Sequence, residues 1–120
     1  MIVQRPPPAK QLVTDPSVKA YMHQKGAELG QFVTSQTMIL WMGQDLFKDS
    51  TNEFGYKIVL VLKDGTAEIR ESGVSKDIYQ AIDRAHTKML AKLHRIQEQV
   101  LSQEERMNQI QAALGNVHVH

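Results

Sequence analysis

The sequence predicts an α+β fold in which two helices lie on one face of an antiparallel sheet. Three observations predict it. Apolar residues recur at helical spacing between residues 16 and 33, they alternate with period two between residues 56 and 62, and they return to helical spacing in the last third of the chain. The expected order is an optional first strand, a helix, three strands and a long helix.

The composition limits the chain to one small globular domain. Its 120 residues are 42% apolar and 22% charged, which suits a folded protein with a single core. The 14 basic and 13 acidic side chains give a net charge of +1, so any basic surface must be local. The absence of cysteine excludes disulfides, zinc–thiolate sites and thiol nucleophiles. Neither a signal peptide nor a membrane span is visible, so we expect a cytoplasmic protein.

The N-terminal third predicts one helix after an irregular start. Residues 1–13 are expected to be extended at best, because Pro6, Pro7 and Pro8 lack backbone donors. Thr14 or Asp15 then caps a helix over about residues 16–33. Two glycines weaken this helix, which therefore needs a sheet to pack on.

The middle of the chain predicts three strands. The apolar run from Thr37 to Leu46 is the first, and the alternating segment 56–62 is the second. Asp64-Gly65 follows directly and favours a two-residue hairpin loop, so residues 66–72 should return antiparallel.

The last helix is predicted to outrun the domain. Ser75 can cap it, and nothing breaks it before Gly115, a length of about 39 residues or roughly 58 Å. We therefore expect a domain over residues 1–95, a helical extension over 96–114 and a flexible tail over 115–120. The extension carries apolar residues in a 4,3 alternation that Gln103 interrupts, which is typical of a coiled coil. The residues expected to meet a partner are Leu93, Ile96, Val100, Met107, Ile110 and Leu114.

A basic stripe follows the first half of the same helix. Arg84, Lys88, Lys92 and Arg95 are spaced by four, four and three residues, so they share an arc of about 80°. Residues 76–95 hold five basic and two acidic side chains, a net charge of +3. Such a stripe can follow a phosphate backbone, although a solvated helix face would look the same.

Metal binding and catalysis find no support in the sequence. The histidines offer no pair at i,i+4 spacing, and no carboxylate or cysteine completes a ligand set. There is also no glycine-rich phosphate loop and no nucleophile elbow. We therefore expect no cofactor, no metal, no small-molecule substrate and no enzymatic activity. Trp41 could stack on a base, but in an apolar strand it is more often a core residue.

The residues that begin the last helix resemble those of a known family. Ser75-Lys76-Asp77-Ile78-Tyr79-Gln80-Ala81-Ile82-Asp83 follows the Asp64-Gly65 hairpin and precedes the spaced basic residues Lys88, Lys92 and Arg95. This pattern resembles the ribosome-associated inhibitor and hibernation promoting factor family, also called the sigma-54 modulation protein family, over about residues 10–97.

The resemblance implies a β-α-β-β-β-α domain similar to double-stranded-RNA-binding domains. Its sheet would be four-stranded, or three-stranded if residues 1–10 do not pair. It also implies a ribosome hibernation factor that binds ribosomal RNA on the small subunit and inhibits translation in response to stress. The implied RNA contacts are Lys19, Lys25, Arg84, Lys88, Lys92 and Arg95.

Two other functions remain open at this stage. One is an interaction or dimerisation module that acts through the helical extension, most simply as a homodimer. The other is a general double-stranded-RNA-binding protein with the same topology. Whether the protein dimerises ribosomes or only blocks the decoding region, and what induces it, cannot be predicted from the sequence.

Overall fold

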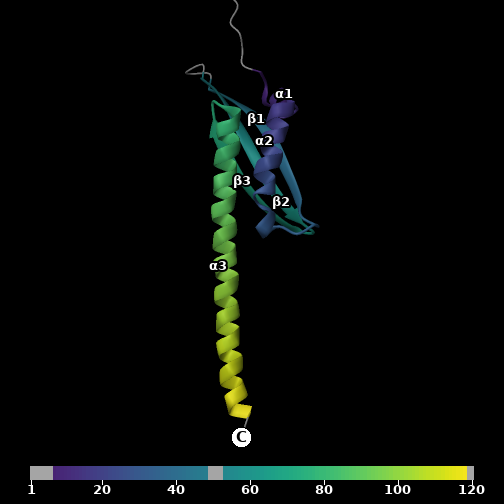
Figure 1. Ribbon diagram of the computed structural model, residues 1–120. Coiled ribbons are helices and arrows are strands. Elements are labelled where there is room, and N and C mark those ends of the chain that lie inside the picture. The colour runs from purple at the N-terminus through teal and green to yellow at the C-terminus, as the bar shows by residue number, and fades with distance from the viewer. Residues whose placement is uncertain (1–6, 49–52, 119–120) are drawn as a thin grey trace, which may run out of the picture. The chain divides into compact units, whose positions relative to one another are not determined.

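The computed structural model describes residues 7–48 and 53–118, with side chains for 7–46 and 54–111. The chain divides into two compact units, residues 1–90 and 91–120. The elements in chain order are α1 (Ala9–Leu12), α2 (Pro16–Ala27), a short 3-10 helix (Gly30–Phe32), β1 (Met38–Lys48), β2 (Glu53–Asp64), β3 (Ala67–Ser75) and α3 (Ile78–His118) (Figure 1). This is an α+β fold, as the sequence predicts.

In the first unit, three antiparallel strands form a sheet in the order β1-β2-β3. The alternation in β2 has the predicted effect, because Tyr56, Ile58, Leu60 and Leu62 are all buried on the face that carries the helices. Helix α2 and the first part of α3 lie side by side over this face (Figure 1). They contribute Val18, Met22, Ile82, Ala85 and Met89 to the core.

The segment before α2 differs from the prediction. Residues 9–12 form the short helix α1 instead of extended chain, and α1 packs on β1 near Gly43, where an added Cβ would lie 3.3 Å from the Cβ of Ala9. The hydroxyl of Tyr56 donates to the carbonyl of Pro7 at 2.7 Å. The prediction of a strand in residues 1–10 falls mostly on residues 1–6, which lie outside the described residues. The described sheet has three strands.

The ends of α2 follow from local chemistry. Asp15 is the N-cap: its Oδ1 accepts hydrogen bonds from the backbone N–H of Ser17 and Val18, and Pro16 occupies the first turn. The helix ends at Ala27 and not at residue 33, because the chain tightens into the 3-10 helix after Leu29.

The hairpin is present, but its loop lies one residue later than predicted. Asp64 pairs with Ala67, so the loop is Gly65-Thr66, with Gly65 at a φ of 60°. Only glycine adopts that angle at little steric cost, which explains why the turn falls there.

Helix α3 begins and ends later than the sequence suggests. The backbone N–H of Asp77 donates to Ser75 Oγ, and that of Tyr79 donates to Asp77 Oδ1, so both side chains cap the first turn. The helix then continues to His118, through Gly115, where we expected it to stop. A single glycine costs about 1 kcal/mol in a helix, which lowers its stability without necessarily ending it.

Candidate nucleic-acid interface

The part of α3 in the first unit presents two basic side chains beside its core face. Ala85 and Met89 are buried, whereas Arg84 and Lys88 are exposed. The guanidinium of Arg84 donates a hydrogen bond to the carbonyl of Val74, at the edge of β3. Arg84 is therefore held beside the sheet edge and keeps donors for a second acceptor.

The remaining two residues of the predicted stripe lie in the second unit. Arg95 is exposed there, and Lys92 is half-buried. Both belong to the same continuous helix, α3.

The two lysines of α2 face different surroundings. They are six residues apart, which places them about 120° apart around the helix. Lys19 is exposed and lines a cleft of about 400 Å³ together with His23 and Trp41. Trp41 is half-buried, so it is neither a full core residue nor a free stacking platform. Lys25 points to the opposite side, towards α3.

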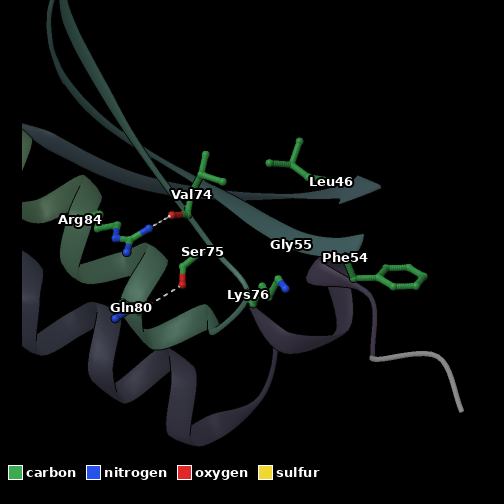
Figure 2. A pocket seen from close by; sticks show the side chains of 8 residues that line it. All are labelled: Leu46, Phe54, Gly55, Val74, Ser75, Lys76, Gln80 and Arg84. Atoms are coloured by element: carbon green, nitrogen blue, oxygen red, sulfur yellow. Dashed lines mark hydrogen bonds between the residues drawn. The ribbon is translucent and has the colours of Figure 1, made fainter. Parts of the chain in front are cut away.

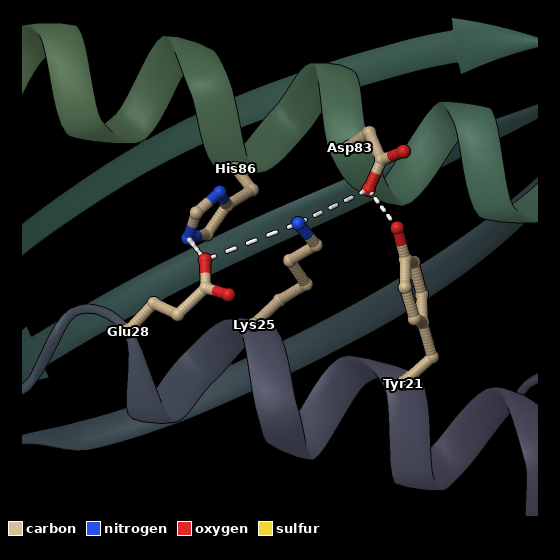
Figure 3. Close-up of polar contacts among 5 residues, drawn as sticks. All are labelled: Tyr21, Lys25, Glu28, Asp83 and His86. Carbon is tan, nitrogen blue, oxygen red and sulfur yellow. Dashed lines mark hydrogen bonds and ion pairs between the residues drawn. The ribbon is translucent and has the colours of Figure 1, made fainter.

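Lys25 belongs to a polar network between α2 and α3 (Figure 3). Its Nζ lies 3.6 Å from Asp83 Oδ1 and 3.9 Å from Glu28 Oε2. The hydroxyl of Tyr21 donates to the same Asp83 oxygen, and the Lys25 ammonium lies 5.4 Å from the centre of the Tyr21 ring. Two carboxylates thus balance the charge of Lys25 within the protein. Sequence reasoning missed this network, because its members come from two helices that are far apart in the sequence and meet only in the fold.

His86 closes the network and is the one member that is almost fully buried. Its Nε2 lies 3.4 Å from Glu28 Oε2, a contact without the geometry of a hydrogen bond. Burial lowers the pKa of His86 from its ordinary value of 6.5, and the nearby Glu28 carboxylate opposes this only in part.

The pKa of Tyr21 is shifted in the opposite direction, upwards. Its hydrogen bond to Asp83, together with desolvation, raises the pKa of Tyr21 from 10.0 to about 12. Ionisation would place a phenolate beside a carboxylate, which is electrostatically unfavourable. The two pKa shifts therefore both favour the neutral form of the side chain, the phenol of Tyr21 and the neutral imidazole of His86.

A second cleft, of about 420 Å³, lies where the sheet ends and α3 begins (Figure 2). It was not predicted, because its walls combine residues of all three strands with the start of α3, and the sequence alone does not show how these elements pack. Apolar side chains and two cations line it, and none of the described lining residues is acidic. The lining residues are Leu46, Phe54, Gly55, Val74, Ser75, Lys76, Gln80 and Arg84.

The apolar seam of the second unit is only partly available to a partner. Ile96, Val100, Met107 and Ile110 are exposed, between 37% and 55% of their surface. Leu93, which we expected at the same interface, is buried in the single chain. The side chain of Leu114 lies outside the described residues.

Two features are absent from the described part of the chain. No group of three or more histidine, cysteine, aspartate or glutamate side chains is arranged to hold a metal ion. No helix there is both long and apolar enough to cross a membrane.

Comparison with known proteins identifies one family. The family model described as "Sigma 54 modulation protein / S30EA ribosomal protein" matches residues 9–101. No curated protein sequence matches the chain. Among solved structures, the crystal structure of the Thermus thermophilus Protein Y N-terminal domain is similar, with 19% sequence identity and a TM-score of 0.47. The match covers 70% of this chain and 86% of that one.

Proposed function

Because the chain belongs to the sigma 54 modulation protein / S30EA ribosomal protein family, the family of ribosome hibernation factors, we propose that it binds ribosomal RNA on the small ribosomal subunit and inhibits translation. The family match over residues 9–101 is the observation that carries this proposal. The protein would act in the cytoplasm as a binding factor, without turnover and without a cofactor.

The exposed basic side chains of both helices support an electrostatic mode of binding. Arg84 and Lys88 are exposed in the first unit, and Arg95 is exposed in the second. With Lys19 and Lys92 they would contact backbone phosphates, which supply most of the affinity in such complexes. Lys25 would contribute less, because Asp83 and Glu28 already balance its charge. Its role would be to hold α2 against α3.

Co-sedimentation with purified small subunits tests the proposal. We expect the double variant Lys88→Glu/Arg95→Glu to lose binding, because each reversal replaces an attraction to phosphate with a repulsion. The matched control Lys10→Glu/Lys63→Glu changes the net charge equally at two other exposed positions and should bind as the parent does. Equal binding of both double variants would refute the assignment of the stripe.

Salt dependence gives an independent check of the same contacts. The logarithm of the binding constant should fall steeply with the logarithm of the salt concentration, since each phosphate contact releases counterions. Lys88→Gln should weaken binding and reduce that slope by about 1. An unchanged slope would show that Lys88 does not contact phosphate.

The apolar seam of the second unit supports a further proposal, that two copies of the chain associate through it. Ile96, Val100, Met107 and Ile110 stay exposed in the single chain at coiled-coil spacing. A parallel, in-register pair would place Gln103 opposite its own copy, where the two amides can hydrogen-bond, whereas an unrelated apolar partner would leave this amide unpaired. A seam of only about two heptads lies at the low end of stable interface sizes, so we expect a weak dimer.

A further inference from the structure

The sheet carries apolar side chains on both faces, although the helices cover only one. Directly paired residues of antiparallel strands share a face, and neighbours along a strand lie on opposite faces. Gly73 lies against α3 and pairs with Ile58, so the register fixes which residues face away from the helices. Figure 2 shows Leu46 and Val74 pointing away from α3, whereas Ser75 points towards it. We call this second face the open face, and its apolar residues are Met38, Leu40, Met42, Leu46, Val59, Val61 and Val74.

The apolar residues of the open face are exposed mainly along β1. Met38, Leu40 and Met42 follow one another on this face, and between 41% and 56% of their surface is exposed. An antiparallel sheet with one solvated face usually carries polar side chains there. A contiguous exposed apolar row instead marks an interaction surface. The composition of the open face therefore indicates that a partner covers it.

The dimensions of the open face fit one helix. From Met38 to Leu46 the strand β1 advances by eight residues, or about 27 Å, which is the length of a helix of about 18 residues. Three strands spaced by about 4.8 Å place the outer two about 10 Å apart, which is close to the diameter of a helix. A helix packed on a sheet is also the arrangement that the other face already has.

The charged side chains of the open face are mostly basic. Among the residues whose side chains the structure describes, the register assigns to it Lys57, Lys63, Arg70 and Glu68, a net charge of +2. Arg70 donates two hydrogen bonds to Glu68, of 3.1 and 3.3 Å, so this carboxylate is already engaged. Glu71 borders the face at the β3 edge, and the net charge is still +1 when Glu71 is counted. The open face therefore favours an acidic partner.

We propose that the open face binds an amphipathic helix of another protein, with an apolar row along β1 and acidic side chains near both ends. Lys57 and Lys63 stand at the two ends of the open-face row of β2, about 20 Å apart, which corresponds to about 13 residues of a helix. RNA is a poorer ligand, because no described residue of this face is aromatic and could stack on a base. A second copy of the same face would be repelled by its net positive charge.

This inference goes beyond the proposed function and does not depend on it. The basic side chains proposed to contact RNA belong to α2 and α3, and in the first unit these helices cover the other face of the sheet (Figure 1). The open face would therefore stay accessible to a protein partner while the helices bind RNA.

Titration of the isotope-labelled full chain with two synthetic helical peptides of about 18 residues, followed by amide chemical shifts, tests the open face. Both peptides carry leucines at spacings of three and four residues. One has glutamates near both ends, and the other has lysines at the same positions. We expect the glutamate peptide to cause saturable shifts at Leu40, Met42 and Val59. It should bind at least about tenfold more tightly than the lysine peptide, because like charges across an interface are strongly unfavourable.

Charge exchange separates recognition from a loss of folding. Lys57→Glu/Lys63→Glu should reverse the preference, so that the lysine peptide binds more tightly than the glutamate peptide. The reversal also shows that the variant is folded, because an unfolded chain would bind neither peptide. Leu40→Asp, at an exposed position of the open face, should weaken the glutamate peptide at least about tenfold, since binding would bury an unpaired charge. The matched control Val100→Asp places the same carboxylate at an exposed apolar position of the second unit and should bind as the parent does.

Several results would overturn the assignment. An absence of shifts on the open face, or equal affinity for the two peptides, would show that this face does not recognise an acidic helix. Shifts in the second unit that Val100→Asp abolishes would place the peptide on the apolar seam. Shifts at Leu40 and Met42 on dilution of the chain alone would show that a second copy occupies the face. Tighter binding of a single-stranded RNA oligonucleotide at the same amides would make it a nucleic-acid surface.

Discussion

The crossing of α3 over β3 depends on one residue without a side chain, Gly73. A Cβ added there would lie 2.2 Å from the carbonyl oxygen of Ala81, 2.5 Å from the backbone nitrogen of Ala85 and 2.7 Å from the Cβ of Arg84. Ordinary contacts of a Cβ begin near 3.4 Å. Two of the three atoms belong to the helix backbone, so no side-chain rotation can relieve the overlap. We therefore predict that Gly73→Ala forces α3 away from the sheet.

The size of the effect follows from that geometry. The helix must move by about 1 Å, which loosens the packing of Ile82 and Met89 on the sheet. Overpacking of a core costs typically 1–3 kcal/mol, and contact with rigid backbone places Gly73→Ala near the upper end, at about 3 kcal/mol. For a domain of this size, that lowers the melting temperature by roughly 12–24 °C.

Thermal unfolding followed by circular dichroism measures this loss, with Gly30→Ala as the control. A Cβ at Gly30 meets nothing within 4 Å and sits in a helical turn, so this variant should match the parent or gain up to about 1 kcal/mol. A Gly73→Ala melting temperature within about 3 °C of the parent would refute the close approach of α3 and β3.

Three further predictions concern the helix network and the tail. The folded state keeps Tyr21 protonated to about pH 12, whereas the unfolded chain ionises it near pH 10. The free energy of unfolding should therefore fall between those two pH values. Tyr21→Phe should remove this loss in denaturant titrations at high pH. Burial lowers the pKa of His86, so stability should fall as the pH drops below 6.5, and His86→Gln should flatten that profile whereas His23→Gln should not. If two copies pair through the seam, Val100→Asp should convert the dimer to a monomer in analytical ultracentrifugation, and a parent that is monomeric at tens of micromolar would exclude the dimer.

The sequence predicted those parts of the fold that depend on local patterns. The period-two alternation in β2 and the cap at Asp15 each involve residues close together in the chain, and both are confirmed. The hairpin is also confirmed, with its loop displaced by one residue, because Asp64 still pairs with Ala67 and Gly65, which has a positive φ angle, is the first residue of the loop. The helix α1 was missed, since three prolines argue against regular structure in residues 6–8 and say little about residues 9–12.

The clefts and the close helix–sheet crossing could not be predicted in this way. Gly73 is unremarkable in the sequence, and its importance appears only when Ala81 and Ala85 are brought against it. The same holds for Phe54 and Lys76, which are 22 positions apart and share a cleft because β2 and β3 pair in a particular register. Which residues share such a site depends on how strands and helices pair over long distances in the chain. The periodicity of residues within one strand or helix does not specify that pairing.

The two lysines of α2 show where a charge pattern stops being informative. From spacing alone, Lys19 and Lys25 are equivalent candidates for a phosphate contact. In the fold, Lys19 stays exposed beside Trp41, whereas Lys25 lies within 4 Å of two carboxylates. A phosphate that approached Lys25 would have to compete with both of them and would be repelled by each. The residue that distinguishes the two lysines is Asp83, which is 58 positions beyond Lys25 and reaches it only through the packing of α3 against α2. A basic residue therefore counts towards an RNA-binding surface only when the opposite helix leaves its charge unbalanced.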